Sequence, residues 1–169
     1  MKRGLLLTAL MMLTLVSYGR KYVDADAVVV SDTIYYSADR MNVNNVQNAS
    51  YYRLLMKQGN GINREDVFKD YYMNGQLRAE GGYSFVDLSN DENTKFNGDV
   101  TTYYPNGQKK WHGKFVNGKL NGYLVVKLRD GGVAAAEFAN GKSKYDYFTV
   151  TRPDGTVEKH RIGELKSLL

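Results

Sequence analysis

Four turn dipeptides recur in one register along this 169-residue chain, and they constrain its fold more than any other feature. They are Asn74-Gly75, Asn106-Gly107, Asp130-Gly131 and Asp154-Gly155, whose glycines are 32, 24 and 24 residues apart. Asn-Gly and Asp-Gly favour positive φ at both central positions of a type I′ turn, which joins the strands of a two-residue β-hairpin. The spacing therefore predicts an all-β fold, an elongated antiparallel meander of stacked hairpin repeats over residues 66–169.

A second set of Asn-Gly pairs lies between these tips and includes Asn117-Gly118. We therefore predict structural turns at Gly75, Gly107, Gly118, Gly131 and Gly155. The polar residues 87–95 account for the longer spacing between the first two tips, so we expect a mobile loop insertion there.

The segment around residues 111–128 shows the strand pattern most clearly. Alternation places Trp111, Gly113 and Phe115 on one face, where they form a packed surface with the apolar residues of the following strand. A glycine within an apolar face leaves room for an aromatic ring from the neighbouring strand. We expect aromatic rings over glycine to form the core.

Residues 20–65 form a less regular leading segment. Residues 27–30 and 33–36 are rich in β-branched and aromatic side chains and are predicted strands, and the polar residues 39–48 are a predicted loop. Residues 50–57 fit either a short helix capped by Ser50 or a strand. The glycines that follow favour a strand, paired in a hairpin with residues 62–73.

The first 19 residues have the organisation of a secretory signal peptide. Lys2-Arg3 precedes an apolar run over residues 5–16, and Ser17 and Gly19 supply small residues for cleavage before Arg20. The apolar run of twelve residues is short for a membrane anchor, which needs roughly twenty. We expect an exported, periplasmic or extracellular protein. The chain contains no cysteine, which excludes disulfides and a lipidated cysteine.

The repeats resemble a known family. Residues 103–107, Tyr-Tyr-Pro-Asn-Gly, together with Trp111, Gly113, Phe115, Gly118 and Gly122, are similar to the MORN repeat in its bacterial Tyr-Tyr-x-Asn-Gly form. The resemblance covers about residues 66–155 and weakens after Gly131. It implies β-hairpins stacked edge to edge, with the last hairpins serving as a cap. Similar arrays are the YwqK-like antitoxins and exported proteins of Bacteroidetes.

No catalytic, cofactor-binding or metal-binding site is predicted. The two histidines, His112 and His160, have no acidic or cysteine partners at metal-ligand spacing, and no nucleophile elbow or phosphate-binding loop is present. The glycines are explained as turns. We therefore expect a protein that is not an enzyme.

The face opposite the packed one is the predicted partner contact. Its residues are Tyr103, Lys110, His112, Lys114, Tyr123 and Lys127. Tyrosines beside cations suit contact with a protein or an envelope surface, so we expect an interaction scaffold with an unknown protein partner. The alternative is an antitoxin or immunity-type protein that binds a cognate toxin.

The charge of the chain argues against nucleic acid as the partner. Removing Lys2 and Arg3 lowers Lys+Arg from 23 to 21 against 18 acids, so the net charge falls from +5 to +3. The basic residues are scattered among acids and form no continuous stripe. The same small surplus gives only weak support for contact with an acidic membrane surface. The oligomeric state is not predicted.

Overall fold

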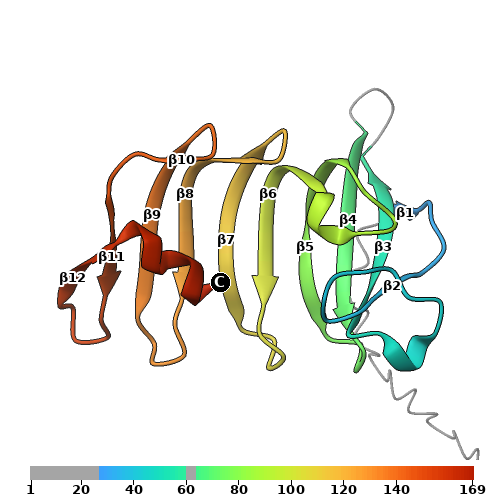
Figure 1. The fold of residues 1–169 in the computed structure, drawn as a ribbon, viewed down its shortest axis with the longest axis horizontal. Coiled ribbons are helices and arrows are strands. Elements are labelled where there is room, and N and C mark those ends of the chain that lie inside the picture. The colour runs from blue at the N-terminus through green and yellow to red at the C-terminus, as the bar shows by residue number, and fades with distance from the viewer. Residues whose placement is uncertain (1–26, 60–63) are drawn as a thin grey trace, which may run out of the picture.

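The computed structural model describes residues 27–59 and 64–169. The predicted signal peptide, and most of the turn around residue 60, lie outside the described residues. The rest forms one antiparallel sheet of twelve strands, in which most neighbours in the sheet are neighbours in the chain (Figure 1). This confirms the predicted all-β meander of consecutive hairpins. The strands are β1 (Ala27–Val29), β2 (Ile34–Tyr36), β3 (Tyr51–Gln58), β4 (Glu65–Tyr72), β5 (Leu77–Phe85), β6 (Lys95–Tyr103), β7 (Lys109–Val116), β8 (Lys119–Lys127), β9 (Val133–Ala139), β10 (Lys142–Ser143), β11 (Tyr147–Thr151) and β12 (Val157–Arg161).

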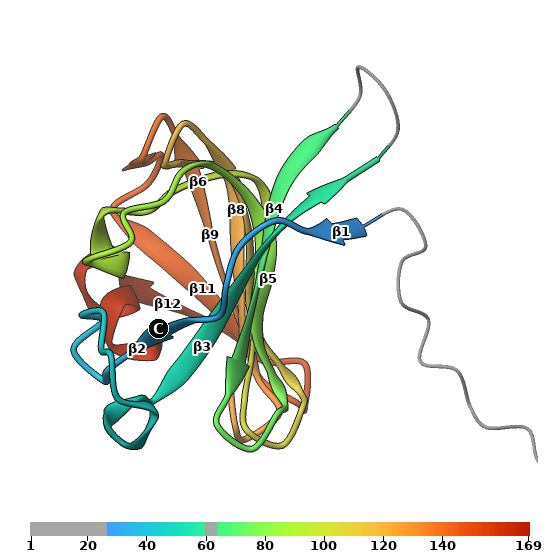
Figure 2. The same ribbon diagram turned by 90° about the vertical axis from the view of Figure 1, so that its right-hand side faces the viewer.

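The sheet is strongly curved, and short elements cover its concave face (Figure 2). The 3-10 helix η4 (Ile162–Leu168) lies on this face beneath β8, β9 and β11. At the other end of the sheet the concave side carries β2, η1 (Val46–Asn48) and η3 (Asp91–Asn93). No helix among the described residues has the length and apolarity that crossing a bilayer demands.

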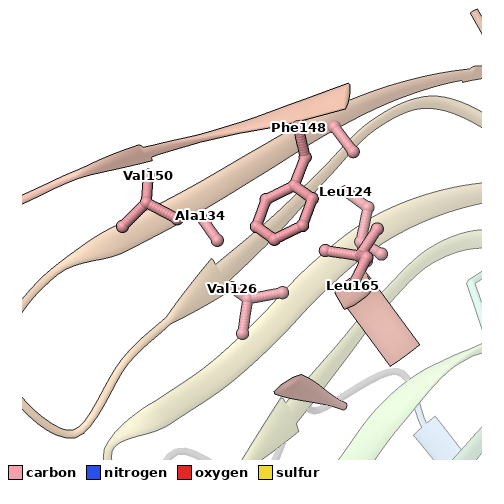
Figure 3. Close-up of a cluster of buried hydrophobic side chains, with 7 residues drawn as sticks. Leu124, Val126, Ala134, Phe148, Val150 and Leu165 are labelled. Carbon is pink, nitrogen blue, oxygen red and sulfur yellow. The ribbon is translucent and has the colours of Figure 1, made fainter. Parts of the chain in front are cut away.

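Two apolar clusters line the concave face. The larger joins β8, β9 and β11 to η4, whose Leu165 lies beside Leu124 and the ring of Phe148 (Figure 3). The smaller is built on Phe68, Ala79 and Val100. Trp111 packs against both clusters and Phe115 against the smaller one, so the predicted packed face is the concave face.

Leucine side chains of the neighbouring strand approach Gly113 more closely than any aromatic ring, and the nearest ring, that of Phe115, belongs to the same strand. A Cβ atom at this position would lie 2.9 Å from Leu120 Cδ2 and 3.2 Å from Leu124 Cδ1, both from β8. The prediction of a cross-strand ring over this glycine is therefore wrong, because leucine methyl groups take the space. Gly81 is needed for a different reason: a Cβ there would lie 2.6 Å from the backbone oxygen of Asp99.

The four repeated tips have one geometry, but it is not the predicted type I′ turn. At the second tip the N–H of Gly107 donates to the oxygen of Tyr104, and the N–H of Tyr104 donates to the oxygen of Gln108, both at 2.8 Å. Only the glycine has positive φ, +81° at Gly107, while Asn106 does not. Three residues thus connect the strands, as in a type I turn followed by a glycine bulge. The same pattern occurs at Gly75, Gly131 and Gly155.

The asparagine or aspartate side chain of these tips accepts a backbone hydrogen bond within the turn. Asn106 Oδ1 accepts the N–H of Gln108 at 3.1 Å, and Asp154 Oδ1 accepts the N–H of Thr156 at 2.9 Å. Short side chains of this kind satisfy turn N–H groups that the ladder leaves free. True two-residue type I′ turns occur at the opposite ends of the strands, at Asn117-Gly118 and Asn140-Gly141, where both residues have positive φ.

The leading segment joins the sheet without interruption. Residues 51–58 form strand β3, as favoured over the helix, and β3 pairs with β4 along its full length. β1 and β2 pair with the other edge of β3. The insertion at residues 87–95 has hydrogen bonds of its own, since Asp87 accepts from Ser89, Asn90 and Asn93.

We predict that Gly107→Val destabilises the protein by about 1–3 kcal/mol, because a β-branched residue is strained at positive φ. No atom lies within 4 Å of the Cβ position, so the loss comes from the backbone alone. Gly107→Asn should lose less, since asparagine tolerates this conformation. Thermal unfolding of both variants checks this, and an unchanged melting temperature for Gly107→Val would contradict the assigned turn.

Candidate functional site

Four of the six predicted contact residues lie together on the outer, convex face. His112, Lys114, Tyr123 and Lys127 are exposed, and the neighbouring residues Gly113, Leu124 and Val126 are buried on the other side. Tyr123 is 60% exposed. His112 Nδ1 lies 3.0 Å from Thr101 Oγ1, and its Nε2 lies 3.5 Å from Asp99 Oδ1. The alternation of the strands therefore placed these four side chains correctly.

Tyr103 is less available than the sequence suggests. Its hydroxyl donates to Glu80 Oε1 at 2.6 Å, and the residue is only partly exposed. Burial raises the pKa of Tyr103 to about 12, and the bond to the Glu80 carboxylate contributes to the shift. This side chain ties β6 to β5.

Lys110 was predicted on the outer face, and this is wrong. Thr102 pairs with Trp111 while Tyr103 pairs with Lys109, so Lys110 is the extra residue of a β-bulge. A bulge re-aims the side chains beside it. Lys110 Nζ reaches the concave side, where it donates to the backbone oxygen of Leu169.

Arg78 occupies the equivalent place in the preceding hairpin. Asp70 pairs with Ala79 and Tyr71 with Leu77, which leaves Arg78 as the extra residue. Arg78 and Lys110 each follow a tip glycine by three positions. Both line one pocket on the concave face, with a volume of about 210 Å³.

The floor of this pocket is a buried ion pair between adjacent strands. Arg53 and Asp70 are each 1% exposed and face each other in register on β3 and β4. Arg53 Nε donates to Asp70 Oδ1 at 2.7 Å, and Nη2 donates to Oδ2 at 2.9 Å. The guanidinium also lies over the ring of Phe68, 4.5 Å from its centroid. This bidentate geometry is the strong form of an arginine–carboxylate pair.

The insertion completes the hydrogen bonds of this pair. Arg53 Nη1 donates to Asp91 Oδ1 and, at 3.2 Å, to Thr94 Oγ1. The Tyr51 hydroxyl donates to Asp91 Oδ2 at 2.6 Å. Arg78 Nη1 adds a donor to Asp70 Oδ2 at 3.2 Å. Every side-chain oxygen of the two aspartates therefore has a partner.

Burial dominates the titration of this cluster. It raises the pKa of Tyr36, which lies on the Arg53 guanidinium, to about 12. It also raises the pKa of Asp70, and the charge of Arg53 opposes that shift. Burial lowers the pKa of Lys110, and the positive charges of Arg129 and Arg78 lower it further. Lys110 is thus a cation in an environment that disfavours its charge.

A tyrosine ladder crosses the outer face at the leading end of the sheet. The ring centroids of Tyr52 and Tyr71 are 5.2 Å apart, and those of Tyr35 and Tyr52 are 6.1 Å apart. The sequence predicts exposed tyrosines on the outer face at Tyr103 and Tyr123, and Tyr123 is exposed there as well. The paired registers of β2, β3 and β4 align the three rings.

The structure adds no grouping of ligands for a metal. Within the described ranges, no three histidine or acidic side chains come together in an arrangement that could hold an ion. His160 lies 3.1 Å from Glu158 Oε2 and stacks on Phe148, with ring centroids 5.3 Å apart.

Comparisons of this chain with protein-family models, curated proteins and solved structures gave no match.

We predict that Asp70→Asn destabilises the protein by about 3–5 kcal/mol, because it leaves the buried Arg53 charge without its counter-ion. The exposed pair of Lys57 and Asp66 on the same two strands is a matched control, and Asp66→Asn should cost at most about 1 kcal/mol. Chemical denaturation of the three proteins measures this difference. Equal losses for the two variants would show that burial of the Arg53–Asp70 pair is unimportant.

Proposed function

We propose that this protein is a non-enzymatic, exported scaffold that binds a protein or an envelope surface through the outer face of β7 and β8. The observation that carries the proposal is Tyr123, a large aromatic side chain of β8 that is 60% exposed. Exposed tyrosines beside cations are typical anchors of protein interfaces, where the ring buries area and the charges form the rim.

The surroundings of Tyr123 support this assignment. In the register of β8 and β9, Tyr123 pairs with Glu137, and on the other side of β8 its neighbour but one, Val125, pairs with His112 of β7. Lys127 lies further along β8 on the same face. The opposite face is taken up by η4 and by the apolar clusters. The outer face is the broad surface left for a macromolecule.

We predict that Tyr123→Ala combined with Lys127→Ala leaves the melting temperature nearly unchanged, because both side chains are exposed. Partner recovery in pull-downs from envelope extract should fall at least tenfold, the loss expected when an interface anchor worth about 2 kcal/mol is removed. Leu88→Ala with Lys166→Ala removes an exposed apolar side chain and an exposed lysine outside β7 and β8 and serves as the control. Undiminished recovery by the first variant would contradict the proposed face.

The export part of the proposal has a separate test. Intact-mass measurement of protein from the envelope fraction should give a chain that begins at Arg20, because cleavage is expected after Gly19. A full-length product in the cytoplasm would contradict export and would leave the surface assignment to be judged by the pull-down alone.

A further inference from the structure

The concave pocket is lined by more basic than acidic side chains. Four of its lining residues are basic, Arg40, Arg53, Arg78 and Lys110, and three are acidic, Asp70, Asp91 and Glu92. Two of the acids are already engaged, since Asp70 and Asp91 accept hydrogen bonds from Arg53 at the floor. Leu169, the last residue of the sequence, lines the pocket as well, and Arg129 adds a positive field from beside it.

Lys110 is a basic side chain of the pocket that has no acidic side chain as a partner in the described part of the chain. Among the described residues, no aspartate or glutamate oxygen lies within 4.0 Å of its ammonium group. Its acceptor is a main-chain oxygen of Leu169, the last residue of the sequence. That contact shows that an oxygen acceptor can enter the pocket and reach Lys110.

Other groups in the pocket suit a small organic ligand. Thr102 Oγ1 is buried without a hydrogen-bond partner, and Trp111 supplies an apolar wall. Arg78 uses Nη1 on Asp70 and lays its guanidinium 3.8 Å from the ring centroid of Tyr51, which holds it in place. A fixed guanidinium is pre-organised for a planar carboxylate.

We propose that this pocket binds a small monocarboxylate, whose carboxylate lies between Arg78 and Lys110 and takes the place of the Leu169 oxygen. Trp111 packs against the carbon skeleton, and Thr102 donates its hydroxyl hydrogen to the ligand. The volume of about 210 Å³ admits a ligand no larger than a single sugar ring or a short acid.

The charge balance favours a monoanion over phosphate. A phosphate dianion would bring a second charge toward Asp70, Asp91 and Glu92, which line the same pocket. Like charges at this range disfavour each other.

The single tryptophan of the chain makes the site directly observable, since Trp111 lies in the pocket. We expect glucuronate to change the emission of Trp111 in a saturable manner at constant ionic strength. Glucose, which has the same ring without the carboxylate, should produce no saturable change. Phosphate should bind more weakly than glucuronate.

Variants connect the signal to the pocket. Lys110→Gln should weaken glucuronate binding about tenfold or more, the loss of one charge-assisted hydrogen bond. Lys110→Arg should restore most of it, and Lys114→Gln on the outer face should leave it unchanged. Thermal melts verify that each variant is folded, and Arg78→Gln repeats the test from the second cation. No emission change with glucuronate, an equal response to glucose, or tighter binding of phosphate would overturn the proposal.

Discussion

The curved sheet depends on one buried interaction, the pair of Arg53 and Asp70. Two opposite charges face inward at the same register of β3 and β4, and an ion pair can be buried only when its remaining hydrogen-bonding capacity is met. Asp91 and Thr94 meet it from the connection between β5 and β6. That connection must therefore lie over the concave face, and the ring of Tyr36 is held there with it.

The alternation of apolar and polar residues predicts the strands and their faces more accurately than the Asn-Gly dipeptides predict the turn type. Alternation around Trp111 and Leu124 identified both faces, because a half-buried strand repeats every second residue. The tips were assigned the wrong turn because Asn-Gly serves two geometries. Three residues separate Tyr104 from Gln108, whereas two separate Val116 from Lys119, and this loop length selects the turn type.

The concave pocket was not predictable in the same way. Arg53 and Asp70 interact because of strand register, and the polar composition of residues 87–95 predicts a mobile loop, not a partner of this ion pair. An inward-facing charge in each of two successive strands was the available signal. Strict alternation assigns every second residue to one face and therefore predicts Lys110 on the outer face. The bulge inserts one residue and shifts this alternation, so the prediction is wrong.

The bulges at Arg78 and Lys110 show that one additional residue in a strand can change which side chains a face of the sheet carries. After Gly75 and Gly107 one additional residue turns a cation to the concave side, whereas after Gly131 the pairs Lys127 with Val133 and Val126 with Ala134 follow without a shift. The strand pairs that follow each bulge keep their register. A single-residue insertion or deletion at such a position can therefore move a charged side chain from one face to the other while the sheet stays intact. Evolution of such an array can thus redistribute its binding groups between two surfaces without altering the residues that hold the strands together.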